Sequence, residues 1–506
     1  MKQVCLTPRR FLTQWSLVIA LLIFLPLTTA CRSDTQSKDS NTSSDSDTGL
    51  DSARQLEESD SANTSSDTVT DTAGEPFWDT DRDVEHIGNV AFAQDRILDY
   101  HITMNEALLE EMIEEGIDEE YREAALQITG DGVDLTIPKV GFRYKGDYSL
   151  SHCWSSSGRR LFSGDCAKLS MKIKFDQYIE NARFDGLKRI NLHGMGADES
   201  KMREMLAYGL YRDFGVDTAR TAYVRMQIND EPPFLVLAVE HLDGRYTARH
   251  YYPNGDGNLY KEVWPRDTLT ESAVRDALKT NEDPEDAADV SAFLDFGAAV
   301  SAATQRNFVE TVGAYTDVTH LLRYMAVDRA IKNWDGITVF YWPERPHNFY
   351  WYHDVENTGR IWLIPWDLDN TFWEHDPYMD VDGLEAERPI PNWNVKPATC
   401  ELITVWDEFG VPPVGCDPLI NLLAATGWDE FATLGNELLT GLFTADKMNA
   451  DLDRWEQLIA PVVADDPYLT AKRWQSAVAD LRDILADYIT DFEAHLQEGY
   501  VAEAQK

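Results

Sequence analysis

The chain has 506 residues, of which 43% are hydrophobic, and it contains 15 Trp, 21 Tyr and 20 Phe. This apolar content is enough for a sizeable core, which excludes a chain that is disordered throughout. The 45 basic and 88 acidic side chains give a formal net charge of −43, which disfavours nucleic acid as a partner because the field repels polyanions. We interpret the charge as a solvated acidic surface.

The first 30 residues have the pattern of a secretory signal. Basic residues precede an apolar run over residues 15–27, which is short for a membrane span. The run ends in the letters LTTAC, which resemble the lipobox of bacterial lipoproteins and make Cys31 the expected lipid-modified residue. We therefore expect an exported protein anchored to the cell envelope, at the outer membrane where the host has two membranes. Because Thr28 replaces the usual aliphatic residue of the motif, ordinary signal cleavage and a retained anchor are the alternatives.

Residues 31–79 are rich in Ser, Asp and Thr and contain hardly any aromatic residue. Such a segment cannot bury enough apolar surface to fold, so we predict a disordered acidic tether. Its main expected role is to space a folded domain from the lipid surface, although its hydroxyl groups are also candidate phosphate acceptors.

Four of the six cysteines lie beyond the signal and the lipobox, and they form two local pairs: Cys153 with Cys166, and Cys400 with Cys416. In an exported protein this arrangement predicts two short-loop disulfides, each worth ~3 kcal/mol. Zinc binding is the alternative, but neither a Cys-x-x-Cys motif nor a nearby pair of histidines supports it.

The remaining sequence predicts one α+β domain over residues 80–416, followed by a helical segment over residues 417–506. Expected elements of the first part are a strand at 96–103, a helix at 106–115, a hairpin at 124–144 and a strand at 169–175. In the last of these strands, alternation places Lys172 and Lys174 on the same face. Without further context, two such lysines indicate only a solvated strand face.

A helix is expected after Asp198, which is a plausible N-cap, and it ends near Gly215. Glu204 lies beside its apolar stripe, where it can reach a neighbouring strand. A hairpin over 222–228 and 234–242 follows, and Glu240 is a polar residue at the end of its nearly continuous apolar second strand.

Acidic residues flank a second predicted hairpin. A helix that begins after Asp317 leads to Asp335, and strands at 347–352 and 360–365 lead to Asp367 and Asp369. Because a hairpin returns the chain to its partner strand, these carboxylates and the amide of Asn348 are expected to share one end of the ladder. Crowded carboxylates repel one another, and oxygen ligands in this number suit Mg²⁺ or Mn²⁺. The same order of residues occurs in a protein-kinase catalytic loop followed by its metal-binding Asp.

The sequence between residues 139 and 372 resembles the CotH kinase family throughout, because blocks typical of that family occur in the family's order. The blocks are KLSMKIKF (168–175), REMLAY (203–208), RDFGV (212–216), VEHLD (239–243), GNLYK (257–261), NWDG (333–336), HNFY (347–350) and IPWDLDNTF (364–372).

This resemblance implies an atypical protein-kinase-like fold with two lobes, a mainly β N-terminal part and a helical C-terminal part. It also implies binding of ATP and Mg²⁺, or Mn²⁺, and phosphorylation of Ser or Thr in a surface or coat protein. An alternative is a catalytically silent CotH-like scaffold or adhesin of the envelope. Retention of Asp335 and Asp367 favours the enzyme, because a protein that only binds has no need to keep both.

The resemblance further implies roles for individual residues. Asp335 would orient or deprotonate the acceptor hydroxyl. Asp367 would hold the metal, assisted by Asp369 and Asn348. The remaining assignments are Lys172 or Lys174 as the phosphate clamp, Glu204 as the partner of that lysine, and Glu240 as a nucleotide-binding residue.

Overall fold

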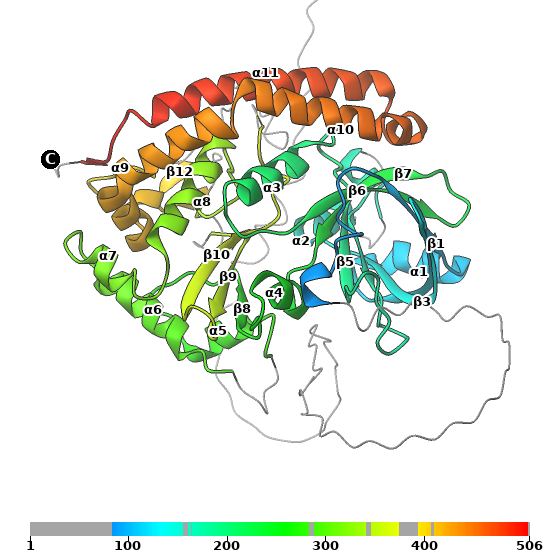
Figure 1. The fold of residues 1–506 in the computed structure, drawn as a ribbon, viewed down its shortest axis with the longest axis horizontal. Coiled ribbons are helices and arrows are strands. Elements are labelled where there is room, and N and C mark those ends of the chain that lie inside the picture. The colour runs from blue at the N-terminus through cyan, green and yellow to red at the C-terminus, as the bar shows by residue number, and fades with distance from the viewer. Residues whose placement is uncertain are drawn as a thin grey trace, which may run out of the picture. The chain divides into compact units, whose positions relative to one another are not determined.

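The computed structural model describes residues 83–154, 160–162, 164–282, 288–340, 346–373, 393–405 and 409–503 (Figure 1). The predicted signal, the lipidation site at Cys31 and the tether lie outside these residues. Within the described part of the chain, no helix combines the length and the apolar character needed to cross a membrane.

Seven strands close into a barrel in the order β1-β2-β3-β4-β5-β7-β6. All neighbours are antiparallel except β1 and β6, which pair in parallel and close the barrel. The strands are β1 (Leu98–Thr103), β2 (Arg122–Gly130), β3 (Val133–Tyr144), β4 (Met171–Lys174), β5 (Arg189–His193), β6 (Thr221–Ile228) and β7 (Phe234–Glu240).

Side chains alternate between the two faces of the barrel wall. In β4, Met171 and Ile173 belong to the core inside the barrel, whereas Lys172 lies opposite Asn191 of β5 on the outer face. The expected hairpins are confirmed, because β2 pairs with β3 up to Gly130 and β6 pairs with β7.

Helices and short 3-10 turns connect or flank the strands. The helices of this part are α1 (Glu106–Glu115), α2 (Asp147–Cys153) and α3 (Arg203–Asp213), and the 3-10 turns are Val84–His86, Gly116–Asp118 and Gly164–Ala167. Helix α1 has the predicted bounds, but the N-cap of α3 is Met202, not Asp198. Asp198 lies further upstream and instead accepts a hydrogen bond from the Arg203 N–H at 3.0 Å.

A three-stranded sheet, ordered β10-β9-β8, lies beyond the barrel in sequence. Its second hairpin is the predicted one, displaced by two residues in β9, and Asp317 caps α8 as expected by accepting from the His320 N–H. The elements are α4 (Gly244–His250), β8 (Asn258–Lys261), α5 (Glu271–Asp276), α6 (Ser291–Ala302), α7 (Phe308–Thr311), α8 (Val318–Ala330), β9 (Phe349–Asp354) and β10 (Arg360–Pro365).

Three long helices complete the fold, and Figure 1 shows α10 and α11 side by side along one edge of it. They are α9 (Pro418–Gly441), α10 (Ala445–Asp465) and α11 (Ala471–His495). Their buried faces join α3, α8 and the three-stranded sheet in one hydrophobic core. Helix α11 also reaches the segment after β10, where Tyr488 donates to the carbonyl oxygen of Trp373 at 2.6 Å and stacks on Phe372.

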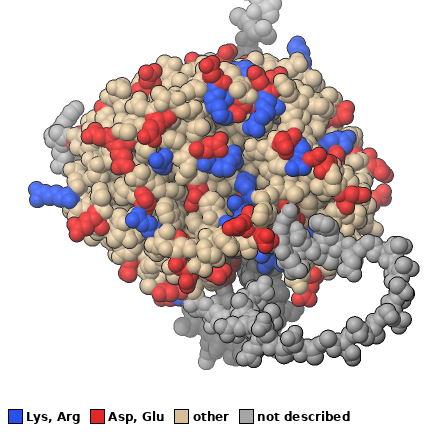
Figure 2. All heavy atoms as spheres, viewed as in Figure 1, with Lys and Arg blue, Asp and Glu red and all other residues tan. Residues whose placement is uncertain are grey.

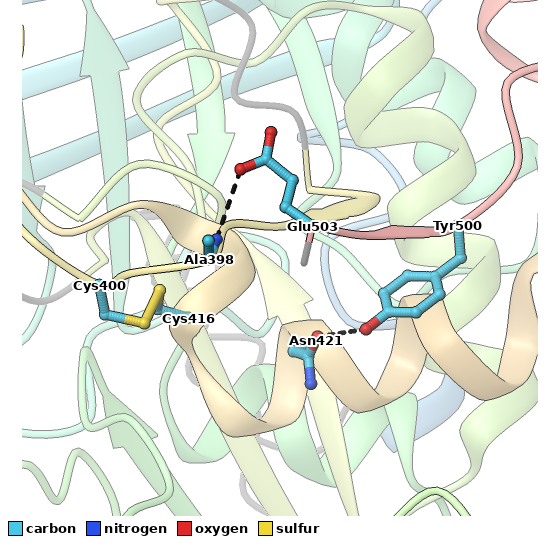
Figure 3. The surroundings of a disulfide bond; sticks show 6 residues. All are labelled: Ala398, Cys400, Cys416, Asn421, Tyr500 and Glu503. Atoms are coloured by element: carbon cyan, nitrogen blue, oxygen red, sulfur yellow. Dashed lines mark hydrogen bonds between the residues drawn. A yellow bond between two sulfur atoms is a disulfide. The ribbon is translucent and has the colours of Figure 1, made fainter. Parts of the chain in front are cut away.

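Both predicted disulfides are confirmed, Cys153–Cys166 and Cys400–Cys416, so neither pair is available for zinc. Figure 3 shows that the second disulfide lies close to hydrogen bonds from the C-terminal segment, including Tyr500 to Asn421 at 3.0 Å. The short strands here are β11 (Val395–Lys396), β12 (Ile403–Val405), β13 (Phe409–Val411) and β14 (Val501–Ala502), with a 3-10 turn at Val414–Cys416.

Acidic side chains are spread over the face drawn in Figure 2, with Lys and Arg between them. Many charges of the described residues form pairs, such as Arg482 with Asp453 and Glu456. Exposed pairs of this kind contribute little to stability, and they suit the solvated surface expected from the composition.

Candidate functional site

The hairpin β9–β10 brings its two flanking segments together. Pro365 pairs with Phe349, and the Trp366 N–H then donates to the Asn348 carbonyl oxygen at 3.1 Å. The Asn348 side chain donates to the backbone oxygen of Asp335 at 3.1 Å. The entry and exit segments therefore meet at one end of the ladder, as the hairpin argument predicts.

Two residues at this end have left-handed backbone conformations, with φ of 60° at Asn348 and 52° at Asp367. Asn and Asp adopt this region more readily than most residues, and such conformations concentrate at functional sites. The Asp367 N–H donates to the hydroxyl oxygen of Tyr208 in α3 at 3.1 Å. Helix α3 therefore helps to fix the backbone that carries the Asp367 carboxylate.

Asp335 is connected to the same segment through its side chain. The Asn370 amide donates to Oδ2 of Asp335 at 2.9 Å. Asn370, Asp367 and Asp369 line one cavity of ≈ 120 Å³. Asp335 thus lies next to a cavity whose wall contains two further carboxylates.

Cationic side chains also line this cavity. Lys145 follows the last residue of β3, Lys168 precedes β4, and Arg203 is the first residue of α3. Glu204 and His193 complete this part of the lining. A cavity with cations and carboxylates on its wall suits a phosphate group bound together with a divalent cation.

Lys145, His193 and Glu204 form a connected group. Lys145 Nζ lies 3.1 Å from Nε2 of His193, and His193 Nδ1 lies 2.7 Å from Oε1 of Glu204. Burial and the charge of Lys145 lower the pKa of His193 to about 3, so the imidazole is neutral at pH 7. Burial, and after it the charge of Asp367, raises the pKa of Glu204 well above its usual value.

The chemistry of this group fits a metal ion. Single ligand atoms of His193, Glu204 and Asp367 lie within 4.8 Å of one another. Oε2 of Glu204 is buried and has no hydrogen-bond partner among the described residues. A cation placed among these groups would relieve both the repulsion between carboxylates and the unsatisfied oxygen.

Lys172 and Lys174, which the family resemblance implies as alternatives for the phosphate clamp, both lie in β4. Neither Lys172 nor Lys174 is among the residues that line the cavity, and Lys145 is. Lys172 pairs in register with Arg143 of β3 and Asn191 of β5, and its charge, after desolvation, lowers the pKa of His241 well below its usual value. The implied pairing of Glu204 with Lys172 or Lys174 is not among the hydrogen bonds of Glu204: its Oε1 contacts His193, which in turn contacts Lys145.

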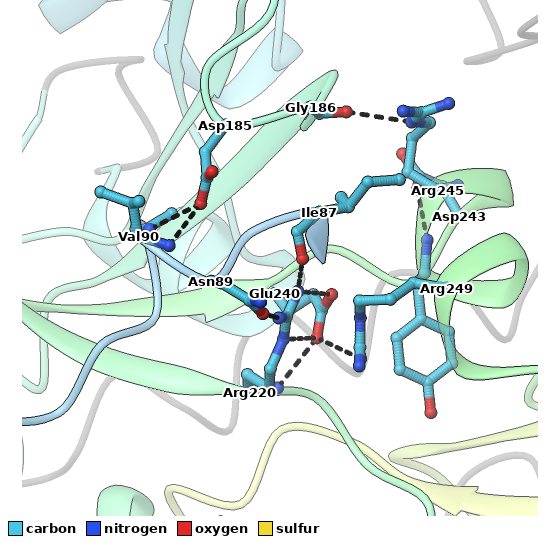
Figure 4. Close-up of polar contacts among 12 residues, drawn as sticks. Ile87, Asn89, Val90, Asp185, Gly186, Arg220, Glu240, Asp243, Arg245 and Arg249 are labelled. Atoms are coloured by element: carbon cyan, nitrogen blue, oxygen red, sulfur yellow. Dashed lines mark hydrogen bonds and ion pairs between the residues drawn. The ribbon is translucent and has the colours of Figure 1, made fainter. Parts of the chain in front are cut away.

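Glu240, which the family resemblance implies as a nucleotide-binding residue, instead forms buried ion pairs within the fold. Its fully buried carboxylate lies 2.6 Å from Arg220 Nη2 and 3.2 Å from Arg249 Nη2 (Figure 4). Burial alone would raise the pKa of Glu240, but Arg249 and Arg220 hold it below its usual value. Arg220 also donates to the carbonyl oxygen of Ile87 at 2.8 Å, so the group ties the N-terminal segment to the barrel.

We expect Glu240→Gln to destabilise the protein by about 3 kcal/mol, because it leaves two guanidinium groups without their buried anion. The midpoint of urea unfolding measures this loss. Glu271→Gln, in an exposed pair with Arg275 on α5, is the matched control and should change stability by less than about 1 kcal/mol. Equal midpoints for the two variants would contradict the structural role of Glu240.

Lys145 and His193 are not predictable as site residues from the sequence. Lys145 comes directly after the hairpin predicted over 124–144, and His193 lies in a strand without a local signal. They are 48 positions apart, and β4 lies between their strands in the barrel. Only the pairing of β3, β4 and β5 brings them together.

Comparison with known proteins bears on the family of the chain. No curated protein matches the chain. Among the solved structures that match is the Helicobacter pylori proinflammatory kinase CtkA, which is 12% identical, with 71% of this chain and 94% of that chain covered. Its TM-score of 0.26 is too low to support any inference about this fold. A family model described as "CotH kinase protein" matches residues 142–496, which is more than half of the chain. The chain therefore belongs to the CotH kinase protein family.

Proposed function

We propose that this protein is an ATP-dependent phosphotransferase that phosphorylates Ser or Thr hydroxyls of a surface or coat protein. The observation that carries the proposal is the meeting of Asp335, Asp367 and Asp369 at one end of the β9–β10 hairpin, next to a cavity that Lys145 also lines. Family membership supports the same reaction class. Phosphoryl transfer depends mainly on positioning and on charge neutralisation, and this cavity offers groups for both.

Asp335 is the proposed base. The Asn370 amide holds Oδ2 of Asp335, and the Asn348 amide holds its backbone oxygen, so both neighbours fix its orientation. The Asp335 carboxylate accepts the proton of the substrate hydroxyl while the hydroxyl oxygen attacks the γ-phosphorus and ADP leaves.

Asp367 and Asp369 are the proposed holders of Mg²⁺ or Mn²⁺, with Asn348 nearby. When bound, the ion would neutralise charge on the phosphate groups. Lys145 takes the role of phosphate clamp that the sequence suggested for Lys172 or Lys174, because Lys145 lines the cavity that contains Asp367.

We further propose that a lipid on Cys31 anchors the protein to the cell envelope, with residues 31–79 as its tether. This part rests on the sequence alone. Labelling of cells with a radioactive fatty acid should mark the protein, and Cys31→Ser should remove the label. Unchanged labelling of the variant would rule out Cys31 as the anchor.

The activity can be tested with the chain from residue 31, labelled ATP and Mg²⁺ or Mn²⁺. Transfer of label to the protein itself or to a Ser-rich acceptor is expected. Asp335→Asn should slow it by about 100-fold or more, because the variant retains hydrogen bonding but cannot take a proton. Asp295→Asn, on the exposed face of α6, is the control and should label as the parent does. Equal labelling by the parent and by Asp335→Asn would refute the role of Asp335 as the base, whereas no labelling by the parent would favour a catalytically silent binding protein.

A further inference from the structure

A chain of hydrogen bonds leads from Lys145 through His193 to Glu204. The three side chains come from the end of β3, the end of β5 and the first turn of α3. An ammonium group has donors only, so Lys145 must donate to Nε2 of His193 across the 3.1 Å contact. Nδ1 then carries the ring proton and donates to Oε1 of Glu204 at 2.7 Å. The lysine thereby sets the histidine tautomer, and the histidine holds the carboxylate.

Both ring nitrogens of His193 take part in these hydrogen bonds, whereas one carboxylate oxygen of Glu204, Oε2, does not. Among the described residues, Oε2 of Glu204 has no hydrogen-bond partner, although the residue is only 2% exposed. An unsatisfied buried acceptor is costly, and a buried anionic one more so. Asp367 supplies a second carboxylate within 4.8 Å of the same group. Oxygen atoms of two carboxylates are therefore available at this place for a cation.

We propose that Glu204 is a direct metal ligand through Oε2, together with Asp367, and that Lys145 and His193 are positioning residues for it. Glu204 is then not the direct partner of a phosphate-clamping lysine, since His193 separates the two. The ligands are oxygens, which suits Mg²⁺ and Mn²⁺. The ion itself follows from the proposed phosphotransferase function, but the role of Glu204 rests on the hydrogen-bonded chain.

Binding of Mn²⁺ alone, without nucleotide, tests the ligand set independently of activity. Titration of the parent, followed by the free-Mn²⁺ signal in electron paramagnetic resonance, gives the dissociation constant. Glu204→Gln should weaken binding by about 10-fold or more, and Glu493→Gln, on the exposed side of α11, should leave it unchanged. Unchanged affinity in Glu204→Gln would overturn the proposal.

Substitutions of His193 test its positioning role. His193→Ala should weaken Mn²⁺ binding by about 10-fold, because Glu204 loses the donor that fixes it. In His193→Asn the side-chain amide occupies the place of Nδ1–H, so binding should recover to within about 3-fold of the parent. Failure of asparagine to restore affinity in a folded variant would contradict the positioning role.

Pulsed electron paramagnetic resonance of Mn²⁺ bound to the unaltered protein tests the ligand set without depending on the folding of a variant. Since both ring nitrogens are occupied, the spectrum should lack coupling from a directly bound imidazole nitrogen. Such a coupling would make His193 a ligand and overturn the proposal. If the parent binds Mn²⁺ normally but transfers no phosphate, only the proposed function is refuted. If Glu204→Gln transfers phosphate as fast as the parent does, only the ligand role of Glu204 is refuted.

Discussion

Asp367→Asn is expected to reduce phosphate transfer by about 1,000-fold while raising the stability of the metal-free protein. The loss follows because the carboxylate that would hold the ion becomes a neutral amide. The gain follows because burial, and after it the charge of Asp367, raises the pKa of Glu204, so removing the charge of Asp367 removes repulsion. Asparagine also accepts the left-handed backbone of Asp367, with φ of 52°, so the fold should persist.

Two measurements check this prediction: the rate of label transfer from ATP, and thermal unfolding in the presence of a chelator. The control is an exposed aspartate, Asp295, whose side chain has no hydrogen bonds within the described residues. Asp354 is not used because it accepts hydrogen bonds from Asn357 and Thr358. Asp295→Asn should match the parent in both assays. A lower melting temperature for Asp367→Asn in chelator would show that this carboxylate stabilises the metal-free protein, contrary to the electrostatic argument.

Arg329→Met is expected to destabilise the protein by about 3–5 kcal/mol, the largest stability effect predicted here. Arg329 and Asp328 form a fully buried pair, and burial raises the pKa of Asp328 against the opposing charge of Arg329. Arg329 also donates to the Asn333 carbonyl oxygen at 3.1 Å, and Asn333 donates to Asp328 at 3.0 Å. The substitution would leave a buried carboxylate without its counter-charge.

The same network supports the segment that carries Asp335. A Cβ atom on Gly336 would lie 2.3 Å from the Asn333 amide nitrogen, so the chain turns tightly over the network at this glycine. Urea unfolding of Arg329→Met measures the loss. Lys332→Met, which removes a more exposed pair with Asp491, is the control and should cost about 1 kcal/mol or less. Similar losses in both variants would contradict the importance of the buried pair.

The acidic end of the site could be predicted from sequence because its geometry is local. Two apolar strands and a turn define the β9–β10 hairpin, and the positions of Asp335, Asp367 and Asp369 at its base follow from that pattern alone. The two disulfides are predictable from the sequence for the same reason, since each closes a short loop.

The cationic side of the site and the closure of the barrel could not be predicted, because both depend on long-range pairing. Strands β1 and β6 pair in parallel across more than 100 residues, and no local pattern indicates that contact. Lys172 has the same alternation as any outward lysine, whereas Lys145 acquires its place only when β3, β4 and β5 pair. Glu240 looked like an active-site residue because the sequence does not show that Arg220 and Arg249 surround it.

The most direct test of the proposed metal site at Asp367 and Glu204 is a crystal structure with Mn²⁺ and a non-hydrolysable ATP analogue. The ion would be located by its anomalous scattering. An ion bound by Asp367 and Glu204, with the analogue's phosphates contacting Lys145, is the predicted result. An ion bound elsewhere in the molecule, with Asp367 and Glu204 left in their present hydrogen bonds, would contradict it.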